Sequence, residues 1–236
     1  MSGAATPLLS RLAWEFRLQR RYYFWTVGLV ITLVWLSLLL FLSASARVLW
    51  LPVIIFADLS NIGLMFIAGM LYLERRQGTL YAVAITPVTP ASWYLQKLFT
   101  LSLLTTACAI VLVLFSALSV NWFFLLPAII LTAALFTCCG FLLALPFDGI
   151  MNYFLAMALC LALLNIPLFA YFGVVDNPFM WLLPSHPALL ALSGSFQDMP
   201  TMQFLLTISV LSLWVIALYL AGARQFRNYL ALRPQA

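Results

Sequence analysis

The stretch LFTLSLLTTACAIVLVLFSALSVNWFFLLPAIILTAALFTCCGFLLALPF, residues 98–147, contains no charged side chain. A helix crosses the hydrocarbon core of a bilayer with about 20 apolar residues, so this run is too long for one crossing. The polar step SVNW, residues 119–122, is the natural place for a turn. The stretch therefore predicts two membrane-spanning helices, over residues 98–118 and 123–145.

The rest of the chain repeats this pattern. Further apolar runs cover residues 22–42, 50–73, 150–171 and 201–221, and only Asp58 interrupts them with a charge. Of the 236 residues, 66% are hydrophobic and 7% are charged, whereas soluble proteins have roughly 45–50% apolar and about 25% charged residues. We therefore expect one all-α integral membrane domain over residues 1–236, with six transmembrane helices.

The basic residues assign an orientation to these spans, because cytoplasmic loops retain Lys and Arg. With the N-terminus inside, ten of the 11 basic residues fall on the inner side and only Arg47 falls outside. This asymmetry predicts a multi-pass protein of the cytoplasmic (inner) membrane with both termini in the cytoplasm. The net charge of +5 is scattered between apolar runs, which argues against nucleic-acid binding.

The N-terminal region precedes the first span with alternating apolar and basic side chains. Residues 5–21 predict an amphipathic helix in the membrane interface, and a flexible basic tail is the alternative. Residues 43–46 (SASA) resemble a signal-peptide cleavage site. The apolar run before them is longer than the roughly 7–15 residues of a typical signal peptide, so we expect an uncleaved first span.

One substantial cytoplasmic loop is expected, over residues 74–97, with the sequence ERRQGTLYAVAITPVTPASWYLQK. Thr79 predicts the start of a short helix after Gly78, because its hydroxyl can accept hydrogen bonds from free backbone N–H groups. The helix is expected to run to Ile85, and Pro87 ends it because the residue before a proline avoids helical backbone angles.

The end of this loop returns the chain to the membrane. A new helix is predicted from Pro90, and Lys97 is expected to anchor it at the interface together with Trp93 and Tyr94. A short apolar helix that is held between charged residues in the cytoplasm suits a hydrophobic groove on a soluble partner.

The same loop carries a family resemblance. The run Glu74, Gly78-Thr79-Leu80, Thr86-Pro87 and then Lys97 resembles the loop of type-2 ATP-binding-cassette (ABC) exporter permeases. In that family the pattern reads approximately E-R-E-x-G-T-L-E-x-L-x-x-T-P, followed by a lysine before the third span. Small six-span permeases of drug-export type, similar to fluoroquinolone export permeases, match it best. Six spans, an amphipathic N-terminal helix and a longer outer segment extend the resemblance over the whole chain.

The resemblance implies a role for the loop. In the family it forms the coupling helix that docks on the nucleotide-binding subunit. The docking residues implied here are Glu74, Arg75, Arg76, Gly78, Thr79, Leu80, Thr86 and Pro87. Tyr81 stands where the family often has Glu, and Arg76 where a second acid is common, so the partner's groove is expected to be less basic than usual.

No phosphate-binding loop is present to hydrolyse ATP. Such a loop requires G-x-x-x-x-G-K-[ST], and the sole lysine, Lys97, is followed by Leu98. ATP and Mg²⁺ are therefore expected on a separate ATPase subunit, and the chain is expected to be no enzyme and to bind no cofactor. The cysteines form no C-x-x-C pair and His186 is the only histidine, so no metal site is predicted.

Four polar residues inside the spans are candidates for the translocation path. Asp58 and Asn61 share one helix face, and an intramembrane acid is costly enough to suggest a function. The alternative is an acid at the outer interface that is hydrated or reached by Arg47. Asn152 and Asn165 mark the fifth span, where bonding between helices is favoured over contact with a substrate.

The segment 172–200 is too polar and too broken by proline to span the membrane, yet too apolar to float in water. It predicts short helices lodged at the outer interface. His186 within it could sense pH, but a structural, hydrogen-bonded histidine is favoured.

The leading hypothesis is a permease subunit of an ABC exporter, with two permease chains (a homodimer or a heterodimer) and two ATPase subunits in the lipid bilayer. It would move a hydrophobic or amphipathic substrate, such as a drug-like compound or a lipid, outward. An ATP-independent secondary transporter or channel is an alternative that needs ionisable residues at the midplane, where only Asp58 qualifies. A membrane assembly scaffold is the third possibility.

Overall fold

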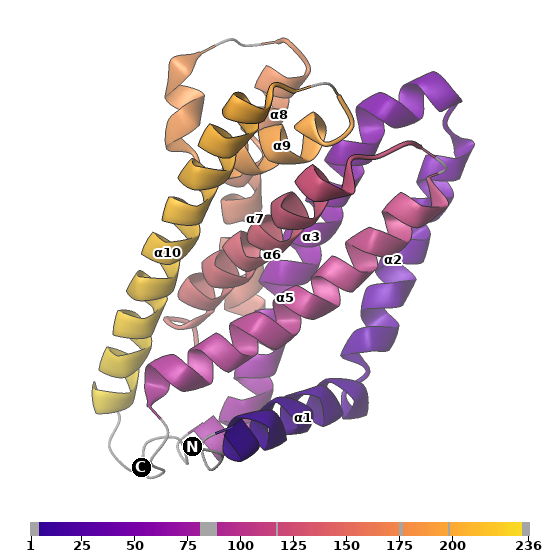
Figure 1. Ribbon diagram of the computed structural model, residues 1–236. Helices are drawn as coiled ribbons and strands as arrows, with labels where there is room; N and C mark the ends of the chain where they lie inside the picture. The colour runs from indigo at the N-terminus through magenta and orange to yellow at the C-terminus, as the bar shows by residue number, and fades with distance from the viewer. Residues whose placement is uncertain (1–4, 81–88, 117, 175–176, 198, 233–236) are drawn as a thin grey trace.

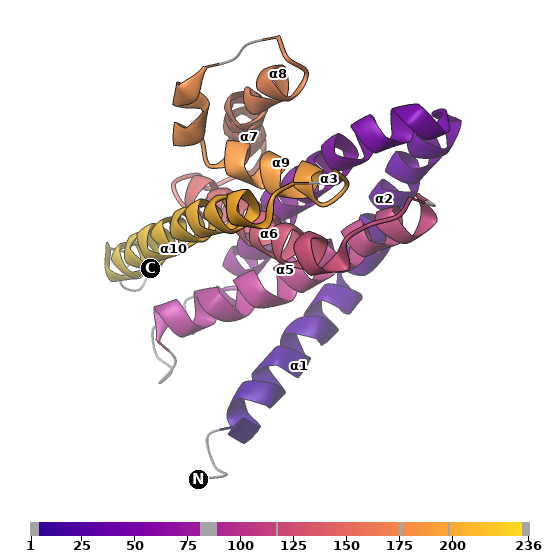
Figure 2. The ribbon, with the colours of Figure 1, turned by 45° about the horizontal axis from the view of Figure 1, so that its top comes forward.

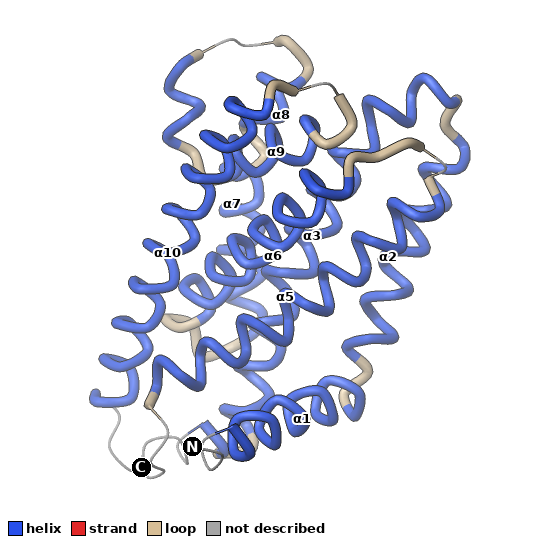
Figure 3. Tube along the Cα trace, viewed as in Figure 1, coloured by secondary structure: helices blue, strands red, loops and turns tan. Residues whose placement is uncertain are grey.

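The structure is a computed structural model that describes residues 5–80, 89–116, 118–174, 177–197 and 199–232. Within these residues the chain consists of helices and loops, without strands (Figure 3). Six of its helical segments are long and apolar enough to cross a membrane. This confirms the predicted class, an all-α integral membrane protein.

The elements follow one another as shown in Figure 1. In chain order they are α1 (Ala5–Arg21), α2 (Phe24–Phe41), α3 (Ala44–Arg76), α5 (Pro90–Phe115), α6 (Trp122–Ala144), α7 (Ile150–Leu164), α8 (Pro167–Tyr171), the 3-10 helix η1 (Pro178–Leu182), α9 (Ser185–Gly194) and α10 (Thr201–Leu232).

Several helices extend beyond the apolar runs in the sequence. Helix α3 begins at Ala44 rather than at residue 50 and continues to Arg76, and α10 continues to Leu232 rather than to residue 221. Helix α5 begins at Pro90, where the sequence predicts a helix start, and enters the apolar run at residue 98 without a break. Polar and charged residues at the ends of these helices therefore belong to the same continuous helices as the spans.

Side-chain caps explain where two of the spans begin. The Thr89 hydroxyl accepts a hydrogen bond from the backbone N–H of Ser92 at 3.2 Å, directly before the proline that starts α5. The Asn121 side-chain oxygen accepts one from the backbone N–H of Phe123 at 3.1 Å and starts α6. Each cap satisfies a backbone donor that the helix cannot pair internally.

Helix α3 is the centre of the bundle and contacts α2, α5, α6 and α9. Its closest neighbour is α6, because Gly63 of α3 faces α6 and Gly140 of α6 faces α3. A Cβ atom on Gly63 would lie 2.9 Å from the Cβ of Phe136, and one on Gly140 would lie 2.8 Å from the Cα of Leu64. The two backbones can approach this closely only without side chains at these positions.

The two ends of the bundle differ in what covers them. Helix α1 lies crosswise at one end, beside the start of α5 (Figures 1 and 2). We call this the α1 end. Helices α8 and α9 lie at the opposite end, the α9 end (Figure 1). In the segment 172–200, where short helices are predicted, η1 and α9 are present, and α9 buries Ala188, Leu189 and Leu192 against the bundle.

Candidate functional site

The α1 end holds a buried cluster of three charged side chains. The Lys97 ammonium of α5 lies 2.5 Å from a carboxylate oxygen of Glu15 in α1 and also contacts a carboxylate oxygen of Glu74 in α3. Only 1% of the Lys97 side chain and 9% of each glutamate side chain are exposed. The cluster ties together three helices that are far apart in the sequence.

Burial makes this cluster a strict constraint on the fold. Buried charges must be paired, and removing one partner of such a pair commonly costs about 3–5 kcal/mol because the other charge is left uncompensated. Here one ammonium serves two carboxylates, so Lys97 is the member on which both others depend. Its ring contact with Trp93, 5.3 Å from Nζ to the ring centroid, adds a further favourable interaction.

Arg75, the next residue after Glu74, points to the other side of α3. Its guanidinium donates to the backbone carbonyls of Leu145, at 2.8 Å, and Phe147, directly after the end of α6. It also lies 4.7 Å from the ring centroid of Tyr229 in α10 and 5.3 Å from that of Tyr72. Arginine is favourable here because the last carbonyls of a helix are unpaired and carry partial negative charge.

Two consecutive residues therefore fix the last turn of α3 to the surrounding helices. Glu74 joins it to α1 and α5, and Arg75 joins it to α6 and α10. Directly after this turn the backbone reverses at Gly78, which has a φ of +69° and open space around its Cα. A residue with a side chain is strained at such an angle, whereas glycine adopts it freely.

The segment that leaves Gly78 begins as a helix. Thr79 and Leu80 are helical, and the Thr79 hydroxyl donates to the backbone carbonyl of Glu74 at 3.2 Å. This helix start agrees with the position predicted from the sequence. The predicted docking residues Thr86 and Pro87, with Ile85, lie outside the described residues.

Apart from Arg75, which is half-buried, the other predicted docking residues divide into two groups. Arg76, Gly78 and Thr79 are exposed at the α1 end. Glu74 and Leu80 are buried inside the chain, at 7% and 0% exposed. Their contribution to a docking surface would therefore be to hold it in place rather than to touch a partner.

The prediction that Lys97 anchors α5 at the lipid surface is not supported, because its ammonium is buried against two carboxylates. The aromatic residues beside it are also buried. Trp93 stacks on Phe226 with ring centroids 4.8 Å apart, and Tyr94 stacks on Phe141 at 4.0 Å. A lysine–aromatic cluster near a span end looks the same in sequence whether it faces lipid or the bundle.

Asp58 lies inside the bundle rather than at its outer surface. Its carboxylate is 0% exposed and one oxygen accepts a hydrogen bond from the Thr32 hydroxyl of α2 at 3.5 Å. Arg47, the predicted alternative partner, instead donates to the backbone carbonyls of Leu40 and Leu42. Asp58 thus joins α2 to α3 within this chain.

The other three candidates for the translocation path do not gather around Asp58. The half-buried Asn61 donates to the backbone carbonyl of Ala57 in its own helix. Asn152 is exposed near the start of α7, and Asn165 follows its last residue. The two asparagines are 13 positions apart, which corresponds to about 20 Å along a helix. The path remains a prediction for these residues.

His186 lies at the start of α9, with its ring edge-on to Trp181 at 5.3 Å between centroids. Burial lowers its pKa below the usual range, so the ring is neutral at pH 7. The predicted hydrogen bond is not present, because Nδ1 of His186 is buried and has no hydrogen-bond partner among the described residues, so the ring is held by packing against Trp181.

Sequence reasoning did not predict that Glu15 and Arg75 link helices. One signal was available for the first. Glu15 is the only acid before Asp58, in an otherwise basic segment, and Lys97 is the only lysine in the chain. No comparable signal marks Arg75, because its partners are backbone carbonyls, which any sequence provides.

Comparisons with known proteins agree with this architecture. The chain matches the fluoroquinolones export permease protein family over residues 6–234. It is 30% identical, over 195 residues, to the fluoroquinolones export permease proteins of two strains of Mycobacterium tuberculosis, and the match covers 82% of this chain and 82% of each relative. No solved structure matches the chain. Six apolar spans and a match over nearly the whole length show that the chain belongs to the fluoroquinolones export permease family and is a transport permease of the membrane.

Proposed function

We propose that this permease is the membrane subunit of an ABC exporter, in which two permease chains work with two ATPase subunits. Its substrates would be hydrophobic or amphipathic drug-like compounds, with fluoroquinolones as the first class to test, given the names of its relatives. ATP and Mg²⁺ would be bound by the ATPase, and the α1 end would face the cytoplasm. The alternative without ATP has less support, because it needs ionisable residues at the midplane and Asp58 is the only charged residue in the six apolar runs.

One observation carries this proposal: the last turn of α3 is bonded to four other helices, and a helix begins immediately after its reversal at Gly78. A partner that pushes on the segment after Gly78 would act on a turn that cannot move without α1, α5, α6 and α10. Force would therefore reach the whole bundle rather than bend one loop.

The proposed cycle needs two packings of the bundle that differ by only a few kcal/mol, so that ATP binding by the partner can select between them. The close backbone contact of α3 with α6 would be kept in both packings, because glycines leave no room for a gradual slide. Helix α7, which has few buried residues, would make the larger changes.

The experiment uses a matched pair of glycines. Gly78 at the α1 end and Gly173 at the α9 end both have positive φ, +69° and +71°, and a Cβ atom would meet nothing at either. Replacing either with valine should cost about 1–2 kcal/mol for the left-handed backbone or redirect the chain. Only Gly78→Val should also misdirect the proposed docking segment.

The measurement is recovery of Mg²⁺-dependent ATPase activity with the tagged permease from native membranes, together with fluoroquinolone export from cells. We expect Gly173→Val to behave as the parent protein, and Gly78→Val to lose most ATPase recovery and export at equal expression. Equal ATPase recovery with both variants would reject the docking role. Export by the purified chain in vesicles without nucleotide would reject the ABC mechanism.

A further inference from the structure

A cavity of about 390 Å³ lies at the α1 end between α1, the end of α3 and the start of α5. Its wall includes Arg11, Trp14 and Arg21 of α1, Gln77 and Thr79 after α3, and Gln96 of α5. Nothing in the proposed coupling role requires this space. Its lining combines hydrogen-bond donors and aromatic surface, as expected for a site that takes a polar group at a membrane boundary.

The charges around the cavity leave a positive excess. Glu15 and Glu74 line it, but both are paired with Lys97. Among the described residues, neither Arg11 nor Arg21 forms an ion pair. Three basic groups against two carboxylates give the site a formal charge of +1, which a ligand with one negative charge would neutralise.

A buried donor in the wall also lacks a partner. Gln96 is 8% exposed, and its side-chain nitrogen forms no hydrogen bond with the residues that the structure describes. A buried N–H group that stays unpaired is unfavourable, so a ligand oxygen at this position would be stabilising. Arg11 and Gln96 together offer the guanidinium and amide donors that bind phosphate oxygens well.

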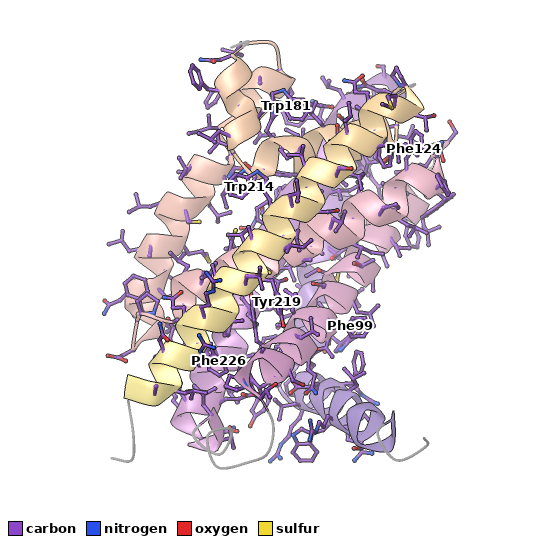
Figure 4. The ribbon with its side chains drawn as sticks, turned by 60° about the vertical axis from the view of Figure 1, so that its left-hand side comes forward. Phe99, Phe124, Trp181, Trp214, Tyr219 and Phe226 are labelled. Atoms are coloured by element: carbon purple, nitrogen blue, oxygen red, sulfur yellow. The ribbon has the colours of Figure 1, made fainter. Side chains whose placement is uncertain are left out.

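An apolar groove adjoins this cavity. It has a volume of about 300 Å³ and is lined by Leu12, Ser92, Leu95, Gln96 and Phe99, so Gln96 belongs to both spaces. Leu95 and Phe99 are 50% and 54% exposed, and Phe99 points away from the bundle (Figure 4). A polar cavity and an apolar groove that share one side chain match the two halves of an amphiphile.

We propose that this composite site binds one anionic phospholipid, with its phosphate in the cavity beside Arg11 and Gln96 and an acyl chain in the groove over Leu95 and Phe99. The net negative headgroup offsets the positive excess of the cavity. Thr79 and Gln77 form part of the same wall, so the bound lipid lies against the start of the segment after Gly78. The inference concerns binding alone and does not depend on an ATPase partner.

The test uses the full chain, purified in detergent and delipidated, with native mass spectrometry as the readout. Phosphatidylglycerol and phosphatidylcholine with identical acyl chains are titrated separately. We expect the first phosphatidylglycerol to bind about tenfold more tightly than phosphatidylcholine, because both carry the phosphate but the choline ammonium cancels its charge and would lie beside the positive excess of the cavity. Arg11→Gln should weaken phosphatidylglycerol binding about tenfold, whereas Arg17→Gln, an exposed arginine of α1 outside both spaces, should leave it unchanged.

The groove is tested on the same protein. Phe99→Ala should weaken long-chain phosphatidylglycerol roughly three- to tenfold through lost apolar contact, with little effect on a dihexanoyl form. Leu103→Ala, one helical turn further along α5 and 44% exposed, is the matched control. Gln96→Leu should weaken the binding of both forms of phosphatidylglycerol. It also removes an unpaired buried donor, so the protein should lose no thermal stability; a loss of binding alone supports the assignment.

Four results would overturn the proposal. Equal affinity for the two lipids would indicate general contact with the bilayer. An equal loss with Arg17→Gln would indicate diffuse charge rather than a site. Binding of glycerol phosphate as tight as that of phosphatidylglycerol would assign a site for a free anion. Loss of fluoroquinolone binding in Arg11→Gln, with unchanged phosphatidylglycerol binding, would assign the cavity to the drug.

Discussion

The two ends of this bundle are closed by different chemistry. At the α9 end, Arg47 is the only charged side chain among the described residues, and it pairs with carbonyls at the end of α2. At the α1 end, Arg75 does the same for the end of α6, but three further charges lie buried between helices. Both ends close a helix with arginine, and only one of them adds a buried ion cluster.

The core follows the same division. Near the α9 end the buried side chains are mostly aliphatic, as around Leu51, Leu125 and Leu189. Near the α1 end they are rich in aromatic rings, and Tyr219 and Phe226 of α10 extend this cluster along the helix (Figure 4). Rings and paired charges lock a geometry more strictly than aliphatic side chains, which indicates that the α1 end is the part whose shape is specified most closely.

The largest expected effect comes from removing the shared cation. Lys97→Met leaves Glu15 and Glu74 buried without a positive partner and should destabilise the protein by about 3–5 kcal/mol. Thermal unfolding in detergent, followed by size-exclusion chromatography, measures the loss. Adding Glu15→Gln and Glu74→Gln should restore much of it. A single Lys97→Met variant with an unchanged melting temperature would show that the cluster does not hold this end.

Two glycines in close contact provide the next test. A Cβ on Gly222 would lie 2.9 Å from the Tyr94 ring, which is itself stacked on Phe141, whereas a Cβ on Gly194 would meet only the flexible side chain of Met199. Gly222→Ala should cost about 1–3 kcal/mol. Gly194→Ala should cost less than Gly222→Ala, because the end of the Met199 side chain can move aside and a stacked ring cannot. Equal losses, measured by thermal unfolding, would mean that the α9 end is packed as rigidly as the α1 end.

Helix caps should not distinguish the ends. Thr89 caps α5 at the α1 end and Asn121 caps α6 at the α9 end, each through one side-chain hydrogen bond to a backbone N–H. Replacing either with alanine should cost about 1 kcal/mol. A much larger loss for Thr89→Ala than for Asn121→Ala would show that the charge cluster depends on the exact start of α5.

The smallest effect concerns the buried side-chain amide of Gln19 in α1. Gln19 is 0% exposed, and neither its side-chain oxygen nor its nitrogen has a hydrogen-bond partner among the described residues. Gln19→Met keeps a similar shape and removes both polar atoms, so it should stabilise the protein by up to about 1 kcal/mol. Gln225→Met, a half-buried glutamine of α10, serves as the control. A fall in melting temperature with Gln19→Met would show that the amide is satisfied in the membrane.

The sequence predicted the spans and their order because apolar length is a local property. It also predicted the helix starts at Thr79 and Pro90. The cap predicted at Thr79 is wrong, because its hydroxyl donates back to the Glu74 carbonyl, whereas Thr89 caps the helix that begins at Pro90. The sequence misassigned Lys97 to the lipid surface because its partner Glu15 is 82 positions away and unrelated in any local pattern. For the same reason the sequence could not decide whether Asp58 is buried, since its burial depends on packing against Thr32 in another helix.

The length of α3 has a consequence for how the protein sits in a bilayer. The part from Pro52, which can kink the helix, to Arg76 has 25 residues and extends about 37 Å, against a hydrocarbon core of roughly 30 Å. An ordinary tilt of about 20° shortens the projection by only a few ångströms, so at least one tip must rise clear of the acyl chains. The end of α3 that carries Glu74 and Arg75 can therefore lie among the lipid headgroups. A soluble protein can contact it there without entering the hydrocarbon core.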